Sequence, residues 1–141
     1  MSLKAPARIF IWFALLAVSL SAQIDPEKVL ILANSSDEKS VALAEDYAEK
    51  RSVPADNIIA LPMSSAETIP GMEFIESIWD PLLEKLIDED WIQGSMRSGR
   101  DDFTRRNVIT FGHRIGAMVI CKGVPLRVAH EDLFMNESDL K

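Results

Sequence analysis

The fold is decided by residues 29–38, which read VLILANSSDE. Five consecutive apolar residues open the stretch without alternating with polar ones, a pattern typical of a strand covered on both faces in a parallel sheet. Asn34 and Ser35 end the apolar run, and Ser35 with Glu38 forms a Ser-x-x-Glu capping box. The stretch therefore predicts a buried strand that leads directly into a helix.

The next residues complete a strand–helix–strand unit. Pro54 prevents the predicted helix from continuing, and residues 58–61 form a second apolar run. Strand, helix and strand occupy about 34 residues, the size of a βαβ unit with a right-handed crossover. The helix has one apolar face, which contains Val41, Ala44, Tyr47 and Ala48.

The second half of the chain predicts a long helix, a polar loop and a third strand. The helix extends from Gly71 to about Trp91, and Asp80-Pro81 in its middle predicts either a kink or two abutting helices. Residues 93–107 are polar and predict an exposed loop, whereas residues 115–121 predict a third buried strand after a short one at 108–111. The alternative for the loop is contact with an acidic partner or a surface glycan through its arginines: Arg97, Arg100, Arg105 and Arg106.

These elements predict an α/β fold with a mainly parallel, doubly wound, Rossmann-like sheet. Three strands with two or three helices form a thin sheet whose edges stay open. Residues beyond 128 are polar and predict no further strand. We therefore expect residues 23–141 to be the amino-terminal part of a larger α/β domain, which makes a truncated gene product one interpretation of the chain.

Residues 1–22 have the three parts of a secretory signal peptide. Lys4 and Arg8 supply positive charge, residues 9–18 are apolar, and small residues place the cleavage site after Ser21 or Ala22. The apolar run is too short to span a hydrocarbon core of ~30 Å. We expect a secreted, periplasmic or cell-envelope protein with no stable membrane insertion after cleavage; an uncleaved membrane anchor is the alternative.

Charge and cysteine content exclude several classes of protein. The chain has a formal net charge of −7, and its leader holds two positive charges and no negative one, so the remainder carries −9. Nonspecific nucleic-acid binding depends on Lys and Arg contacts with phosphates, and we therefore expect no nucleic-acid partner. Cys121 is the only cysteine, which excludes a disulfide within the chain.

Two segments resemble a known family. Residues 44–62 read AEDYAEKRSVPADNIIALP, and residues 121–128 read CKGVPLRV. Together with residues 29–35 they are similar to an uncharacterised secreted bacterial family that occurs in genomes encoding the exosortase and PEP-CTERM sorting system. The resemblance covers roughly residues 28–62 and 107–128 and implies a fold and a compartment but no reaction, because that family has no established activity. Family members are longer than this chain, which agrees with the interpretation as a truncated product.

One residue departs from the family pattern. Ser52 stands where glycine is expected. If the backbone is left-handed there, a residue other than glycine costs on the order of 1 kcal/mol.

The candidate ligand site lies at the carboxyl ends of the predicted strands. In open α/β sheets, ligands bind at the point where the strand order reverses. A 2-1-3 order would place Asn34 and Ser35 beside Lys122 and Gly123, with Arg127 nearby, and this group could hold a carboxylate or a phosphate. The alternative is structural: Ser35 caps the helix, Asn34 stabilises the turn, and both cations are solvated. Residues 33–37 contain no glycine, so no dinucleotide motif is present and no cofactor is predicted.

Other chemistry has weaker support in the sequence. Cys121 ends a predicted strand, as some cysteine nucleophiles do, but His113 is predicted at the opposite end of that strand and beyond hydrogen-bond reach. His130, Glu131 and Asp132 are consecutive and therefore point in different directions, so no metal site is predicted. The leading hypothesis is an exported protein that binds a ligand or partner at the strand carboxyl ends. The alternatives are a hydrolase-like enzyme completed by residues beyond this chain and a nonfunctional truncated product.

Overall fold

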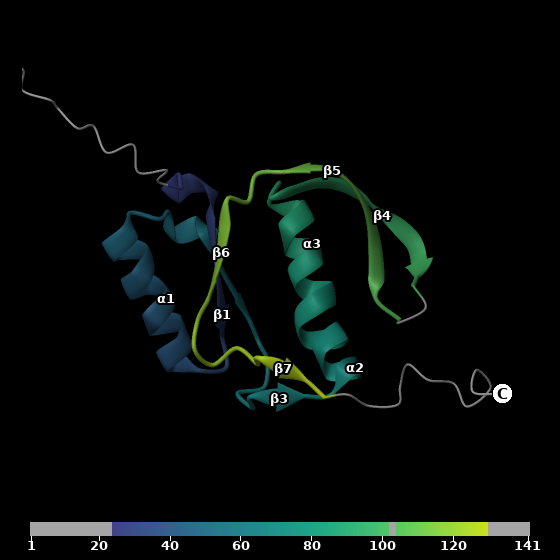
Figure 1. The fold of residues 1–141 in the computed structure, drawn as a ribbon, viewed down its shortest axis with the longest axis horizontal. Helices are drawn as coiled ribbons and strands as arrows, with labels where there is room; N and C mark the ends of the chain where they lie inside the picture. Colours follow the sequence, from purple (N-terminus) through teal and green to yellow (C-terminus); the bar gives the residue numbers. More distant parts are fainter. Residues whose placement is uncertain (1–23, 102–103, 130–141) are drawn as a thin grey trace, which may run out of the picture.

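A computed structural model describes residues 24–101 and 104–129, which form a mixed α/β fold (Figure 1). Its centre is a three-stranded parallel sheet of β1 (Val29–Asn34), β2 (Ile58–Leu61) and β6 (Ala117–Ile120). The order β2-β1-β6 confirms the prediction that the third core strand lies beside the first. The predictions for residues 1–22 and for His130–Asp132 fall outside the described residues.

Helix α1 (Glu38–Arg51) covers one face of the sheet, where Ala44 and Ala48 pack against Val29, Ile31 and Ala33. The predicted capping box is wrong, because Asp37 is the N-cap and its carboxylate accepts from the Lys39 amide at 3.0 Å. The Ser35 amide instead donates to the Leu61 carbonyl at 2.9 Å and so continues the contact between β1 and β2. The helix therefore begins only after a turn over residues 34–37, in which the Asp37 amide donates to the Asn34 carbonyl at 3.1 Å.

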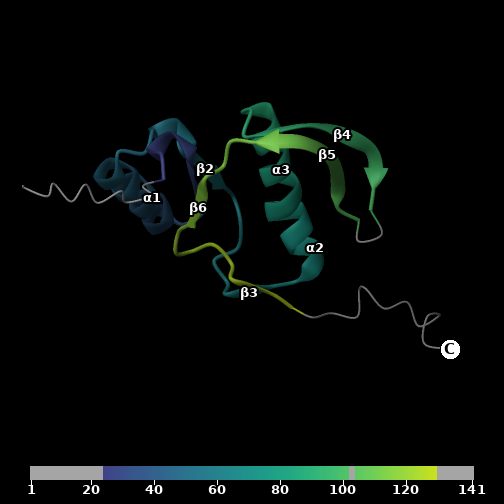
Figure 2. The same cartoon turned by 45° about the horizontal axis from the view of Figure 1, so that its top comes forward.

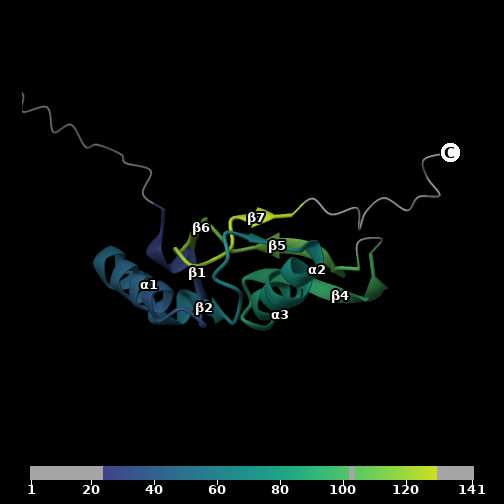
Figure 3. The same cartoon turned by 90° about the horizontal axis from the view of Figure 1, so that it is seen from below.

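The opposite face is covered by a second helical segment (Figures 1 and 3). It comprises α2 (Gly71–Phe74), a π-helical turn (Ile75–Trp79) and α3 (Asp80–Asp88), which ends slightly before the predicted Trp91. Leu30 and Leu32 of β1 pack against Ile78, Leu86 and Trp91. Helices thus lie on both faces of the sheet.

Asp80 does not cap a new helix. It has helical backbone angles, φ −64° and ψ −46°, and the helical segment passes through it. Pro81 cannot donate a backbone hydrogen bond, and a π-helical turn is one of the known ways to accommodate such an interruption. The carboxylate of Asp80 is therefore available to another part of the fold.

That part is an antiparallel hairpin of β4 (Ile92–Arg100) and β5 (Arg106–His113). The predicted loop over residues 93–107 is therefore wrong, since most of these residues lie in paired strands. Both strands are largely exposed, and their side chains lack the apolar alternation that would have revealed them. His113 ends β5 and does not begin the third core strand, which corrects its predicted position. Figure 2 shows α3 flanked by this hairpin.

Short elements complete the chain. Two 3₁₀ turns, Pro26–Lys28 and Ala55–Asn57, precede β1 and β2. β3 (Thr68–Ile69) pairs in parallel with β7 (Arg127–Val128) and ties the carboxyl-end loops together. Among the described residues, no helix is long and apolar enough to cross a membrane.

Candidate functional site

Asn34 is the centre of the carboxyl end of the sheet. Its side chain is fully buried. Its Nδ2 donates to the Gly123 carbonyl at 2.8 Å and to the Ser64 carbonyl at 3.4 Å. Its Oδ1 accepts from the amides of Ser36 at 2.9 Å and Met63 at 3.3 Å. One side chain therefore joins the loops that follow β1, β2 and β6, and its hydrogen-bonding capacity is used within the protein.

Gly123 lies against Asp37 in this junction. Its φ of +100° favours glycine, and a side-chain carbon added at this residue would meet Asp37 Oδ2 at 2.7 Å. A carboxylate thus lies close to the backbone where an anion was expected, and like charges repel. Anion binding at this edge stays a prediction, which the geometry of Asp37 opposes.

The two predicted cations are placed differently. Lys122 is exposed in the loop directly before Gly123 and therefore lies beside the junction. Arg127 belongs to β7, where its Nη2 lies 3.5 Å from Glu67 Oε1. The structure therefore brings Asn34, Gly123 and their loop neighbours Ser35 and Lys122 together, while Arg127 pairs with another element.

An apolar groove, which the sequence pattern did not predict, lies beside this junction. It has a volume of about 480 Å³ and is bounded by the β1 and β6 face of the sheet, by α2 to α3, and by the start of the hairpin. The described residues that line it include no charged side chain: Leu32, Phe74, Ile78, Trp79, Leu82, Leu83, Leu86, Ile92, Ile115, Met118, Ile120, Val124 and Pro125.

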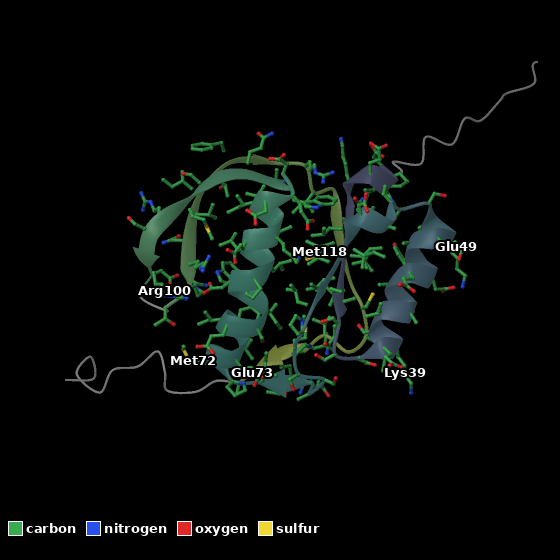
Figure 4. All side chains as sticks on the ribbon, turned by 180° about the vertical axis from the view of Figure 1, so that it is seen from behind. Lys39, Glu49, Met72, Glu73, Arg100 and Met118 are labelled. Carbon is green, nitrogen blue, oxygen red and sulfur yellow. The ribbon has the colours of Figure 1, made fainter. Side chains whose placement is uncertain are left out.

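The groove is open because side chains of β6 that face the helical segment are only partly covered by it. Met118 is 39 % exposed and Ile120 is 53 % exposed, which corrects the prediction of a fully buried third strand. Figure 4 shows Met118 in the space between the sheet and the helical segment. Val119, between them, points to the other face and packs on the α1 side. Continuous apolar character in the sequence could not distinguish a covered strand from one that presents an open apolar face.

Cys121 has the environment of a structural cysteine. It is buried against the α1 side of the sheet, and burial raises the pKa of its thiol. No hydrogen bond joins Cys121 to His113 in the part of the chain that the structure describes. A thiol that stays protonated is a poor nucleophile, which does not favour a catalytic role for Cys121. Over residues 24–101 and 104–129, no cluster of three His, Cys, Asp or Glu side chains is placed to hold a metal ion.

Comparisons with protein-family models, with curated proteins and with solved structures gave no match to this chain.

Proposed function

We propose that this chain is an exported, Rossmann-like, doubly wound α/β protein of the exosortase-associated type that binds a protein partner along β6. Two features of β6 support this proposal. The open apolar groove and a strand edge that pairs with no other described strand both belong to β6. An unpaired strand edge is a template for another chain, and a large apolar surface marks a site of interaction.

The form of the partner follows from the geometry of β6. Met118 and Ile120 alternate with Val119, so only every second side chain faces the groove. A partner strand laid along this edge would also direct alternate side chains into the groove while its backbone pairs with β6. One extended segment can therefore satisfy both features at once.

The chemistry of the partner follows from the lining. All of the lining side chains that the structure describes are apolar or aromatic, although the chain carries a net charge of −7. A charged side chain placed in this groove would lose its hydration without gaining an ion pair. We therefore propose an extended segment whose alternate residues are apolar.

The experiment uses synthetic seven-residue peptides that alternate apolar and polar residues, with Trp79 fluorescence and amide hydrogen exchange as the measurements. We expect saturable binding that protects the amides of β6. Proline at the centre of the peptide should weaken binding, because proline cannot donate to a strand ladder.

Two variants of the protein test whether the peptide binds at β6. Ile120→Asp should weaken peptide binding by about tenfold or more, because burial of such a side chain contributes roughly 1.5–3 kcal/mol. Leu43→Asp, on the exposed side of α1, is the matched control and should bind normally. Equal binding by the two variants, equal binding of the proline peptide, or no binding of any alternating peptide would overturn the proposal.

A further inference from the structure

The β4–β5 hairpin gathers positive charge in an acidic protein. Arg97 and Arg100 lie on β4, and Arg106 lies on β5. These three arginines, with Met96 and Gly99, line a cavity of about 320 Å³. Among the described residues, none lines both this cavity and the apolar groove, so the function of the cavity is independent of the function proposed above.

The pairing of the hairpin places two of these charges face to face. Arg100 and Arg106 are direct cross-strand partners. Like charges opposite each other destabilise a strand pair, and an arrangement that breaks a local rule of folding is often found at a functional site. The repulsion between Arg100 and Arg106 must therefore be offset by an interaction from elsewhere in the fold.

Helix α3 supplies that compensation. Asp80 Oδ2 accepts from Arg100 Nη1 at 2.6 Å, and Asp80 Oδ1 accepts from the Arg106 amide at 2.9 Å. Glu84 Oε1 lies 3.4 Å from Arg106 Nη1. These contacts fix the hairpin on the helix, and Figure 4 shows Arg100 at the hairpin end near α2.

The arginines retain free donors after these contacts. The side chains of Arg100 and Arg106 are 49 % and 42 % exposed, and their contacts with described residues engage Nη1 of each, which in Arg100 also donates to the Thr104 carbonyl. Arg97 is exposed and forms no ion pair with a described residue. Since each guanidinium carries five N–H donors, several remain directed to the cavity or to solvent.

The backbone between Met96 and Arg100 is irregular at the same place. The register of the hairpin shifts there, and Gly99 has a φ of +94°. Such irregularities redirect side chains and are frequent next to binding sites. Here the irregular segment contains Arg97, which lines the cavity although it is not paired in the ladder.

We propose that this hairpin cavity binds a tetrahedral oxyanion, a phosphate or sulfate group, either free or as part of an ester. Among the described residues, Asp80 and Glu84 pair with Arg100 and Arg106, whereas Arg97 pairs with no carboxylate, so its guanidinium is left for a ligand at the cavity. Guanidinium groups bind phosphate and sulfate through paired N–H donors, and a singly or doubly charged oxyanion would compensate the remaining charge.

The experiment titrates the purified full chain with inorganic phosphate, inorganic sulfate, glucose 6-phosphate and glucose 6-sulfate, measured by calorimetry and by the Arg side-chain NMR signals. We expect saturable binding that weakens as ionic strength increases. Tighter binding of the sugar esters than of the inorganic ions would identify an ester as the ligand, and equal binding would identify the free ion. Either result supports an oxyanion site.

The decisive variant is Arg97→Gln, because it breaks no ion pair with the described residues. It should weaken oxyanion binding by about tenfold, as expected for loss of a charge-assisted contact, and leave the melting temperature unchanged. Lys122→Ala removes an exposed cation outside the hairpin and is the matched control. Absence of saturable binding by all four probes would overturn the proposal. So would loss of binding in Lys122→Ala with normal binding in Arg97→Gln, which would place the anion at the strand carboxyl ends.

Discussion

Replacing Asn34 by alanine tests whether this residue holds the fold together or is free to bind a ligand. The substitution removes partners from four backbone groups: the amides of Ser36 and Met63 and the carbonyls of Gly123 and Ser64. Two of these hydrogen bonds, at 2.9 and 2.8 Å, have good length, whereas those at 3.3 and 3.4 Å are weaker.

The expected loss of stability in Asn34→Ala follows from the burial of the Asn34 side chain. An ordinary hydrogen bond contributes about 1 kcal/mol, and a buried group left without a partner costs roughly 1–3 kcal/mol. With two good and two weaker bonds at a fully buried side chain, we expect Asn34→Ala to lower the free energy of unfolding by about 3 kcal/mol. For a chain of this length, that loss corresponds to a fall of about 10 °C in melting temperature.

The assay is urea unfolding followed by circular dichroism, with Asn107→Ala as the control. Asn107 is exposed on β5 and its side chain forms no hydrogen bond with a described residue, so its replacement should change stability by less than about 0.5 kcal/mol. A loss below about 1 kcal/mol in Asn34→Ala would refute the reasoning, because it would mean that these bonds do not hold the three loops.

A second substitution at the same position adds a dependence on pH. Asn34→Asp would place a carboxyl group against the carbonyl oxygens of Gly123 and Ser64. Burial and these oxygens favour the protonated form, so the pKa of the new carboxyl in the folded protein lies above its unfolded value. The protonated carboxyl therefore contributes stability to the folded variant below the unfolded pKa. This contribution is lost as the pH rises through the folded pKa. We expect the deficit relative to wild type to be largest at neutral pH; a deficit that grows on acidification would contradict this account.

The remaining predictions concern the helix end, the cysteine and the leader. Ser52 closes α1 in the left-handed conformation with φ 56°, so Ser52→Gly should raise the free energy of unfolding by up to about 1 kcal/mol in urea titration, and an unchanged or lower value would contradict the strain argument. Burial raises the pKa of the Cys121 thiol, so its alkylation rate should rise with pH only above the range of a free cysteine and should increase when urea unfolds the protein; equal rates in the two states would contradict burial. Amino-terminal sequencing of the exported protein should begin at Ala22 or Gln23, and a retained Met1 would indicate a membrane anchor instead.

Local pattern in the sequence determined the central strand–helix–strand unit. The apolar run of residues 29–33 could be stable only when covered on both faces, and Pro54 limits the helix that follows it. The same reasoning predicted β6 beside β1, which the structure confirms. Ser52, where the resembling family has glycine, is left-handed in the structure. These features depend on neighbours in the chain or on the apolar character of whole strands, which a sequence displays directly.

Tertiary structure alone decided the hairpin, the groove and the partners of the polar side chains. Residues 93–107 lack an apolar pattern, and their strands are held by backbone pairing and by Asp80, which is distant in the sequence. The sequence predicted Asn34 at the end of the first strand. Only the folded chain brings the carbonyls of Ser64 and Gly123 to the side-chain amide of Asn34. The face of β6 is open because the helical segment opposite leaves Met118 and Ile120 partly uncovered, a property of the packing and not of the residues 117–120 themselves. Long-range contacts of this kind leave no periodic signal in a sequence, because each depends on which distant segment reaches the same place.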